Sequence, residues 1–382
     1  MGDYNESVVL DAIRRHPEGL SRVELATSTG LSAQTVSNIC RRLLDQGLAR
    51  ESGKQSTGSG KPRTLLQVAP GARYAVGVHL DPAVITYVLL DLLGTVVAQH
   101  SGTTPRGVDT ELVTADMAAA VTSLVERAGV ERARVLGVGV AAPGPVDLDA
   151  GLVIDPPELP SWGSVPLRDR LAAATGYPVL LDKDVIAAIV AERWAGAATE
   201  SRNSLFFYLG TGSGMGLVVD DTVLRGSSGN VGEVGGLGAA CTTRALVEEA
   251  IELGVLGPER TPAGPQDAER GLERLAGLAA AGDPDAGGII DRWAMRIGRG
   301  VCAAATLLDS DTIVFGGPVW PLLADRLLAV IEPMVTRSPF VRRIHPTLVT
   351  STAIGENVAA VGAACLVLDN TLSARPGSLL LA

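Results

Sequence analysis

The chain has few of the residues from which metal centres and disulfide frameworks are built. It contains four cysteines and four histidines, which lie far apart without a CxxC or HxxxH pair. We therefore expect no metal site made of neighbouring ligands, and no cofactor. Aromatic residues account for only 3% of the chain against 46% hydrophobic residues overall, so the core must consist mainly of alanine, valine and leucine.

Long hydrophobic runs are also missing. No uncharged apolar segment approaches the roughly 20 residues that a membrane helix needs. The first residues, MGDYNESVV, lack the basic start and apolar stretch of a signal peptide. These absences favour a cytoplasmic, reduced protein that does not contact a membrane, and the length of 382 residues predicts two or three domains.

Charge is distributed unevenly along the chain. The formal net charge of −10 argues on average against binding to nucleic acid. Residues 1–68, however, contain 9 basic and 7 acidic residues, whereas the remaining residues contain 23 and 35. Within residues 32–63, six basic residues stand against two acidic ones. An excess of positive charge in one small segment is typical of a DNA-binding surface.

The first seventy residues have the pattern of three short helices. Apolar spacing predicts helices over residues 6–16, 23–29 and 33–45, the second opened by a capping box at Ser21 and Glu24. The third helix has an apolar face and an opposite polar face, which carries Gln34, Asn38 and Arg41, flanked by Ser37 and Arg42. Arginine, asparagine and glutamine are the side chains that make bidentate contacts with base edges in the major groove.

A basic hairpin is expected to follow these helices. After Gly47, two strand-like pieces flank the segment SGKQSTGSGKPR, whose Lys54, Lys61 and Arg63 can approach phosphates. Residues 1–70 are therefore predicted to form a winged helix-turn-helix domain that binds double-stranded DNA. The alternative interpretation is a short helical bundle whose polar face is merely solvated.

The rest of the chain, residues 71–382, alternates pairs of strands with helices, which predicts a two-lobed α/β domain. Five stretches together resemble the ROK family of repressors and sugar kinases: GVHLDPAVITYVLLDLLG, VGVAAPGPVD, LLDKDVIAAIVAE, LGTGSGMGLVVDDTVLRGSSGNVGEVGG and VFGGPV. The resemblance spans essentially the whole chain, including the winged helix that the family's repressors carry and its kinases lack. It implies an actin/hexokinase-like fold for the large domain and assembly into a homodimer or tetramer.

Two loops bear on whether the family's phosphotransfer reaction is retained. ROK kinases have an Asp-x-Gly-Gly-Thr-type loop near the ATP phosphates, and the corresponding stretch here begins at His79 and contains Asp81 and Pro82. A phosphate loop needs backbone N–H groups that point at the anion; proline has none, and a carboxylate repels phosphate. The second loop contains Gly210, Thr211, Gly212 and Gly214. It fits either a phosphate nest or a hairpin that needs positive φ, and the altered first loop favours the hairpin.

The resemblance also implies a sugar site with departures from the family pattern. Lys183-Asp184 stands where the kinases have Asn-Asp, so Asp184 holds the position of the catalytic base beside a cation that would lower its pKa. Both side chains could instead cap the following helix. The family's Gly-Glu-x-Gly-His segment keeps Glu233 but has Gly236 in place of histidine, and its zinc-binding cysteine cluster is reduced to Cys241. No zinc is therefore expected. The expected ligand-binding residues are Lys183, Asp184, Asn230, Glu233 and Glu248.

These observations predict a DNA-binding transcriptional regulator, a repressor in carbohydrate metabolism. It would bind a roughly palindromic operator, respond to a sugar or sugar derivative, and transfer no phosphate. Two alternatives stay open. One is an active, ATP-dependent sugar kinase with a DNA-binding arm, and the other is a DNA-binding dimer that needs no ligand. The loop at Asp81 and Pro82 argues against the kinase.

Overall fold

The computed structural model describes residues 2–55, 62–105, 109–157, 159, 162–234, 241–258, 261–341 and 345–372. Its N-terminal part is a winged helix, as predicted. Strand β3 of the wing pairs with β2 on one side and with β1 on the other, so the sheet order is β1-β3-β2. The elements are α1 (Gly2–Arg14), β1 (Leu20–Ser21), α2 (Arg22–Thr29), α3 (Ala33–Asp45), β2 (Ala49–Gln55) and β3 (Arg63–Val68). The two-residue strand β1 was not predicted, because it is too short to show a period of its own.

The first lobe of the large domain is built on a five-stranded sheet with the order β11-β7-β4-β5-β6. Strand β4 pairs in parallel with β7 and antiparallel with β5. The main elements are β4 (Tyr74–Leu80), β5 (Val84–Asp91), β6 (Val96–Thr103), α4 (Thr110–Arg127), β7 (Val135–Ala142), α5 (Leu167–Thr175), β11 (Val179–Lys183) and α6 (Asp184–Ala195). A small sheet of β8 (Val146–Asp147), β9 (Leu152–Ile154) and β10 (Ser164–Val165) lies beyond β7.

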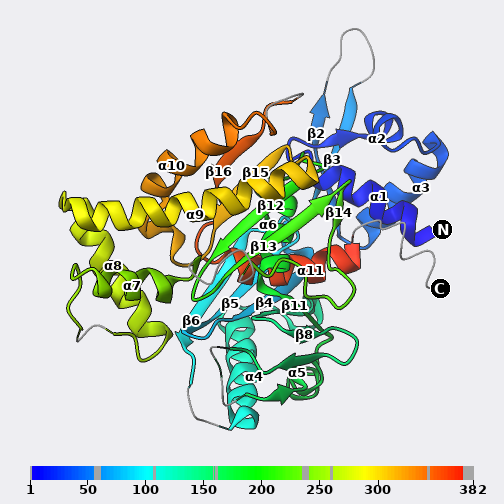
Figure 1. The fold of residues 1–382 in the computed structure, drawn as a ribbon. Helices are drawn as coiled ribbons and strands as arrows, with labels where there is room; N and C mark the ends of the chain where they lie inside the picture. Colours follow the sequence, from blue (N-terminus) through cyan, green and yellow to red (C-terminus); the bar gives the residue numbers. More distant parts are fainter. Residues whose placement is uncertain are drawn as a thin grey trace.

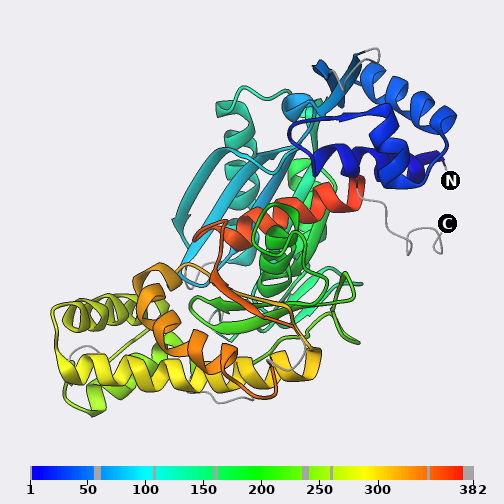
Figure 2. The same ribbon diagram turned by 90° about the horizontal axis from the view of Figure 1, so that it is seen from above.

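The second lobe has a five-stranded sheet with the order β14-β13-β12-β15-β16, so the predicted two-lobed architecture is confirmed (Figure 1). The glycine-rich loop is the turn of the predicted β12–β13 hairpin. The elements are β12 (Ser204–Leu209), β13 (Ser213–Val219), β14 (Thr222–Val223), α7 (Thr243–Glu252), α8 (Pro265–Ala280), α9 (Pro284–Leu308), β15 (Thr312–Gly316), α10 (Ala324–Thr336) and β16 (Leu348–Ser351). Helices α7 to α10 lie at the end of the molecule away from the winged helix (Figure 2).

The last helix, α11 (Val358–Leu372), crosses back from the second lobe to the first and packs against β4, β7 and α6. Glycines permit this close contact. A Cβ on Gly139 would lie 1.8 Å from the Ala363 carbonyl oxygen, and a Cβ on Gly362 would lie 1.7 Å from that of Ala187. Helix α11 was not predicted from sequence, because residues 358–368 are buried all round and show no amphipathic period.

The winged helix packs directly on the large domain. One hydrophobic cluster contains buried residues of α1 and α3, such as Leu10 and Leu43, together with residues of α6 and α11, such as Ile189 and Leu368. The end of α11 meets the N-terminal domain in both ribbon views (Figures 1 and 2). The two domains therefore share a continuous core. Within the residues that the structure describes, no helix combines the length and apolarity needed to cross a lipid bilayer.

Candidate functional site

The candidate recognition helix is α3, and local interactions fix where it starts. The Ser21 hydroxyl accepts a hydrogen bond from the Glu24 N–H, and the Ser21 N–H donates one to the Glu24 carboxylate, so the predicted capping box is present. Helix α2 ends at Gly30, whose φ of 69° gives the sharp turn into α3. The Ser32 hydroxyl then accepts a hydrogen bond from the Thr35 N–H at 3.2 Å. These caps leave only a short turn between α2 and α3, as a helix-turn-helix requires.

The two faces of α3 are the predicted ones. Val36, Ile39, Cys40 and Leu43 are buried in the core of the winged helix. Gln34, Asn38 and Arg41 are exposed on the opposite side, and Ser37 is half-buried. Within the described part of the chain, none of these three exposed side chains has a hydrogen bond or ion pair. The face is therefore free to contact another molecule through its hydrogen-bonding groups.

Arg42 and the wing are placed differently from the rest of the predicted surface. The Nε of Arg42 lies 2.8 Å from a carboxylate oxygen of Glu6, so this arginine ties α3 to α1. Arg63 is exposed at the start of β3. The side chain of Lys54 and the whole of Lys61 lie outside the described residues. The DNA contacts predicted for Arg42 and the wing stay predictions.

A cleft of about 230 Å³ lies at the meeting point of the two lobes. The end of β4, the segment after β7, the start of α6 and the β12–β13 turn contribute to its walls. Among the described residues that line it are Asp81, Pro82, Lys183, Asp184, Thr211, Gly212, Gly214 and Glu233. The structure thus brings together, from four separate segments, most of the residues predicted for the phosphate loops and the sugar site.

The two predicted phosphate loops are joined to each other by Asp81. Its Oδ1 accepts a hydrogen bond from the Ala83 N–H at 2.7 Å and another from the Thr211 hydroxyl at 3.1 Å. The Asp81 side chain is buried, and the hydroxyl of Thr104 also holds its carbonyl. A carboxylate therefore occupies the junction of the two loops, where its charge opposes the entry of a phosphate.

Two glycines at the end of the second loop lie against a helix, a contact that the sequence did not reveal. Positive φ was expected, but Gly210, Gly212 and Gly214 all have negative φ or extended backbone. Gly214 instead lies against α6, where a Cβ would come within 2.5 Å of the Val185 Cγ1. Gly216 is closer still, with 2.3 Å between its Cβ position and the Val185 carbonyl oxygen. The expectation of positive φ was wrong. Close approach to α6 explains Gly214 and Gly216, whereas nothing lies within 4 Å of the Cβ position of Gly212.

Lys183 pairs with Glu233, not with its neighbour. The Lys183 side chain is 2% exposed, and its ammonium contacts the Glu233 carboxylate and the Val231 carbonyl oxygen, the latter at 3.3 Å. Burial raises the pKa of Asp184 to about 7 although Lys183 acts in the opposite direction, so the expected lowering was wrong. Lys183 makes no cap for α6, whereas Asp184 accepts a hydrogen bond from the Val185 N–H at 2.7 Å.

Two predicted ligand residues are engaged elsewhere. The amide side chain of Asn230 bonds both to the N–H and to the carbonyl of Val146, so it fastens its loop to β8. Glu248 faces Arg244 on α7 at 3.8 Å. Neither belongs to the described lining of the cleft, nor does His79, which is buried 3.4 Å from the Tyr208 hydroxyl. The positions of these three residues in the family's motifs did not show which way their side chains point.

The structure adds residues that sequence reasoning missed. Tyr208 lines the cleft beneath the glycine loop, and burial next to Asp81 and Asp184 raises its pKa well above the usual value. Glu269 on α8 has a pKa raised to about 7, by burial and by Asp81. Tyr208 lies two residues before the glycine loop in β12, which was the one available signal. Nothing in the local sequence of α8 indicated that Glu269 lies near Asp81.

Comparison with known proteins identifies both parts of the chain. The profile of the ROK family matches residues 75–370, and that of the MarR family matches residues 3–56. The chain belongs to the ROK family. The xylose repressor of Bacillus spizizenii is 24% identical over 96% of both chains. The glucokinase of Halalkalibacterium halodurans is 26% identical over 80% of this chain and 98% of its own length.

A solved structure matches both domains of this ROK protein together. A ROK family transcriptional regulator, described as a homologue of the E. coli MLC protein, covers 97% of each chain with a TM-score of 0.74 and 21% identity. That likeness supports the fold: a winged helix in front of a two-lobed ROK domain.

Only part of the segment that corresponds to the family's zinc motif lies within the described residues. Gly236, which stands at the family's histidine position, lies outside the described residues. Cys241 is a buried free thiol. Among the residues that are described, no group of three or more histidine, cysteine and carboxylate side chains is placed to hold a metal ion. The expected absence of zinc stays a prediction.

The raised pKa of Asp184 predicts how stability depends on pH. The folded state holds the Asp184 proton up to about pH 7, whereas an unfolded aspartate loses it near pH 4. Between these values the folded state binds more protons, so the free energy of unfolding should fall as the pH rises. Asp184→Asn stays neutral at every pH, so its free energy of unfolding should not show the part of this decrease that comes from Asp184. The variant should therefore be more stable than wild type at pH 8.

Denaturant unfolding of wild type and Asp184→Asn at pH 5, 6, 7 and 8 measures this difference. Glu200→Gln, which removes an exposed carboxylate from the same chain, controls for the loss of one negative charge. Glu269 has a pKa shifted in the same direction, so some slope should persist in the variant. Parallel profiles for wild type and Asp184→Asn would show that the cleft does not hold this proton.

Proposed function

We propose that this ROK protein is a transcriptional repressor that binds operator DNA through α3 and is released by a sugar bound between its lobes. The observation that carries the proposal is the exposed face of Gln34, Asn38 and Arg41, which has no partner among the described residues. These side chain types read base edges in the major groove, and a domain of MarR type presents them on the second helix of its helix-turn-helix.

The cleft supports a small polar effector. The carboxyl groups of Asp184 and Glu233 line it, and such groups accept hydrogen bonds from sugar hydroxyls. Proteins that resemble this chain along their whole length include a xylose repressor. The carboxylate of Asp81 at the junction of the two loops disfavours sugar phosphates and nucleotides, because it would repel their phosphates. A neutral sugar or an amino sugar fits this charge better.

Two copies of the chain would act together on DNA. A twofold dimer presents two α3 helices, so its operator should consist of two inverted half-sites separated by a whole number of helical turns. The exposed Arg63 and the basic wing segment would add phosphate contacts, and these make affinity fall with rising salt. A homodimer is the smallest assembly that satisfies this arrangement.

Retention and elution of genomic fragments test the proposal. Full-length protein on a matrix should retain a small set of fragments that share an inverted repeat at about 150 mM salt. Millimolar D-xylose, D-glucose, N-acetylglucosamine and glucosamine are then tried separately as eluents. Elution by one sugar, lost in Glu233→Ala, supports sensing at the cleft. Fragments that are retained but released by none of the sugars favour the dimer that needs no ligand.

Sugar kinase activity is the second candidate, because a carboxyl group with a pKa near 7 suits a general base for a sugar hydroxyl. A glucokinase is also among the relatives. Against it stands Asp81, which fills the junction of the two phosphate loops. We expect no ADP formation above a protein-free blank with Mg-ATP and each of the four sugars. Steady ADP formation that disappears in Asp184→Asn would establish a kinase instead.

A further inference from the structure

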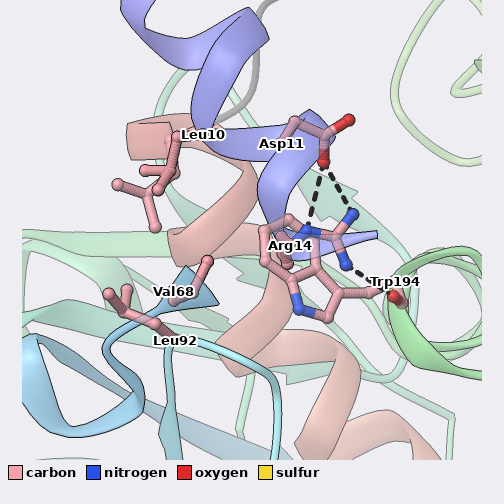
Figure 3. Close-up of a pocket in the computed structure, with 7 residues that line it drawn as sticks. Leu10, Asp11, Arg14, Val68, Leu92 and Trp194 are labelled. Atoms are coloured by element: carbon pink, nitrogen blue, oxygen red, sulfur yellow. Dashed lines mark hydrogen bonds and ion pairs between the residues drawn. The ribbon is translucent and has the colours of Figure 1, made fainter. Parts of the chain in front are cut away.

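The winged helix and the ROK domain meet at an arginine that stacks on a tryptophan. Figure 3 shows Arg14 of α1 between Asp11 and Trp194, the penultimate residue of α6. The guanidinium carbon lies 3.9 Å from the centre of the indole ring, and Nη1 donates a hydrogen bond to the Trp194 carbonyl at 2.8 Å. The Arg14 side chain is only 9% exposed. Such a desolvated cation–π pair is stronger than one at the surface.

This contact closes the C-terminal end of α6. The last carbonyl groups of a helix lack partners within the helix and carry partial negative charge, which a cation there stabilises. Asp11 holds the guanidinium in place through Oδ1, at 2.7 Å from Nη2 and 3.1 Å from Nε. The indole itself is packed against the β5–β6 turn, where a Cβ on Gly94 would lie 2.9 Å from the ring. Arg14 is thus firmly attached to α6.

The other end of α6 forms a wall of the cleft. Asp184 and Val185, its first two residues, line the cavity, and Val185 lies against the glycine loop. The ten steps along the helix from Asp184 to Trp194 span roughly 15 Å at 1.5 Å per residue. Residues 185–192 are all buried, and the carboxylate of Glu192 accepts a hydrogen bond from the Ala197 N–H at 2.7 Å. A close-packed helix held in this way transmits displacement along its axis.

We propose that α6 couples the cleft to the DNA-binding domain, with Arg14 as the residue that transmits its position to α1. The proposal rests on the function proposed above and specifies how the site is regulated. A ligand that contacts Asp184 and binds one position of α6 better than another shifts α6 toward that position. Arg14 then carries α1, and with it α3 through the Arg42–Glu6 ion pair and the shared core. In a dimer, this movement changes the spacing of the two recognition helices.

Arg14 is a positioning residue in this scheme, so its test measures coupling and not binding alone. The cleft is perturbed by Asp184→Asn at pH 8, where the wild-type carboxyl group has lost its proton, in full-length protein with and without Arg14→Lys. Two quantities are followed: hydrogen exchange of the α1 amides by mass spectrometry, and the Kd for the operator fragment. We expect Asp184→Asn to change both by threefold or more in the wild-type background. With Arg14→Lys, each change should fall below 1.5-fold.

A neighbouring arginine provides the matched control. Arg15 directly follows the last residue of α1 and contacts the same Asp11 at 2.8 Å, but it is 44% exposed and, among the described residues, does not reach Trp194. Arg15→Lys should keep the full threefold response to Asp184→Asn. Trp194→Phe, which shortens the stacked ring, should weaken the response as Arg14→Lys does. It provides the same test if Arg14→Lys fails to show a cooperative thermal transition.

The outcomes separate this proposal from the proposed function. Equal responses to Asp184→Asn with and without Arg14→Lys, or no response in either, would overturn the coupling while operator binding itself stands. A response of the α1 amides that depends on Arg14, in a protein that retains no DNA fragment, would support the coupling and reject the function as a DNA-binding regulator.

Discussion

Replacing Arg41 by alanine should weaken operator binding by roughly 5- to 150-fold, because one good bidentate contact with a base pair contributes about 1–3 kcal/mol of discrimination. The Arg41 side chain is exposed on α3, and among the described residues it has no intramolecular partner. Its removal should therefore leave folding intact. The loss should also relax sequence preference, so that affinity falls most for the wild-type operator and least for unrelated duplex.

Fluorescence anisotropy titrations of the retained fragment and a scrambled duplex measure both effects. Arg127→Ala removes an exposed arginine from the last turn of α4, in the first lobe, and should change neither affinity. Arg63→Ala should weaken both duplexes alike and reduce the slope of log K against log salt by about one, as expected for a phosphate contact. Equal affinities of wild type and Arg41→Ala for the operator would refute the assignment of α3 as the recognition helix.

A Gly362→Ala substitution should lower the free energy of unfolding by about 3 kcal/mol or more, at the upper end of overpacking effects. The added Cβ would lie 1.7 Å from the Ala187 carbonyl oxygen, so α11 must move away from α6. Both helices belong to the core that joins the winged helix to the ROK domain. The substitution should therefore destabilise both the winged helix and the ROK domain, because they share this core.

A glycine-to-alanine substitution at an open position of the chain should instead raise the free energy of unfolding. Gly277 is exposed on α8 and has nothing within 4 Å of its Cβ position, so alanine there should stabilise by roughly 0.5–1 kcal/mol. Urea unfolding followed by far-UV circular dichroism measures both variants. Similar midpoints for Gly362→Ala and Gly277→Ala would mean that α11 and α6 are not packed as closely as described.

The features that could be predicted from sequence are those set by local interactions. The capping box at Ser21 and the polar face of α3 depend on residues three or four positions apart, so they are visible in the sequence. Helix α11 was missed, because a helix that is apolar on every side has no period to detect. The resemblance to the ROK family located the cleft segments, which are far apart in the chain.

The contacts within the site could not be predicted, because they depend on how distant segments approach. Lys183 is next to Asp184 in the chain, yet the loop that carries Glu233 comes closer to its ammonium group. Asn230 was predicted to bind a ligand, but its amide bonds to Val146 instead. Similarly, the contact of Gly214 with Val185 joins the end of the glycine loop to a helix that precedes it in the chain.

Selection of duplexes from a random pool, carried out in parallel with wild type and Arg41→Ala at about 150 mM salt, tests the central claim most directly. The account predicts that wild type enriches one inverted repeat over successive rounds, and that Arg41→Ala loses the preference at a single symmetric pair of base positions. A wild-type pool that stays random, or the same enriched motif at full strength from both proteins, would contradict the claim that α3 reads DNA through this face.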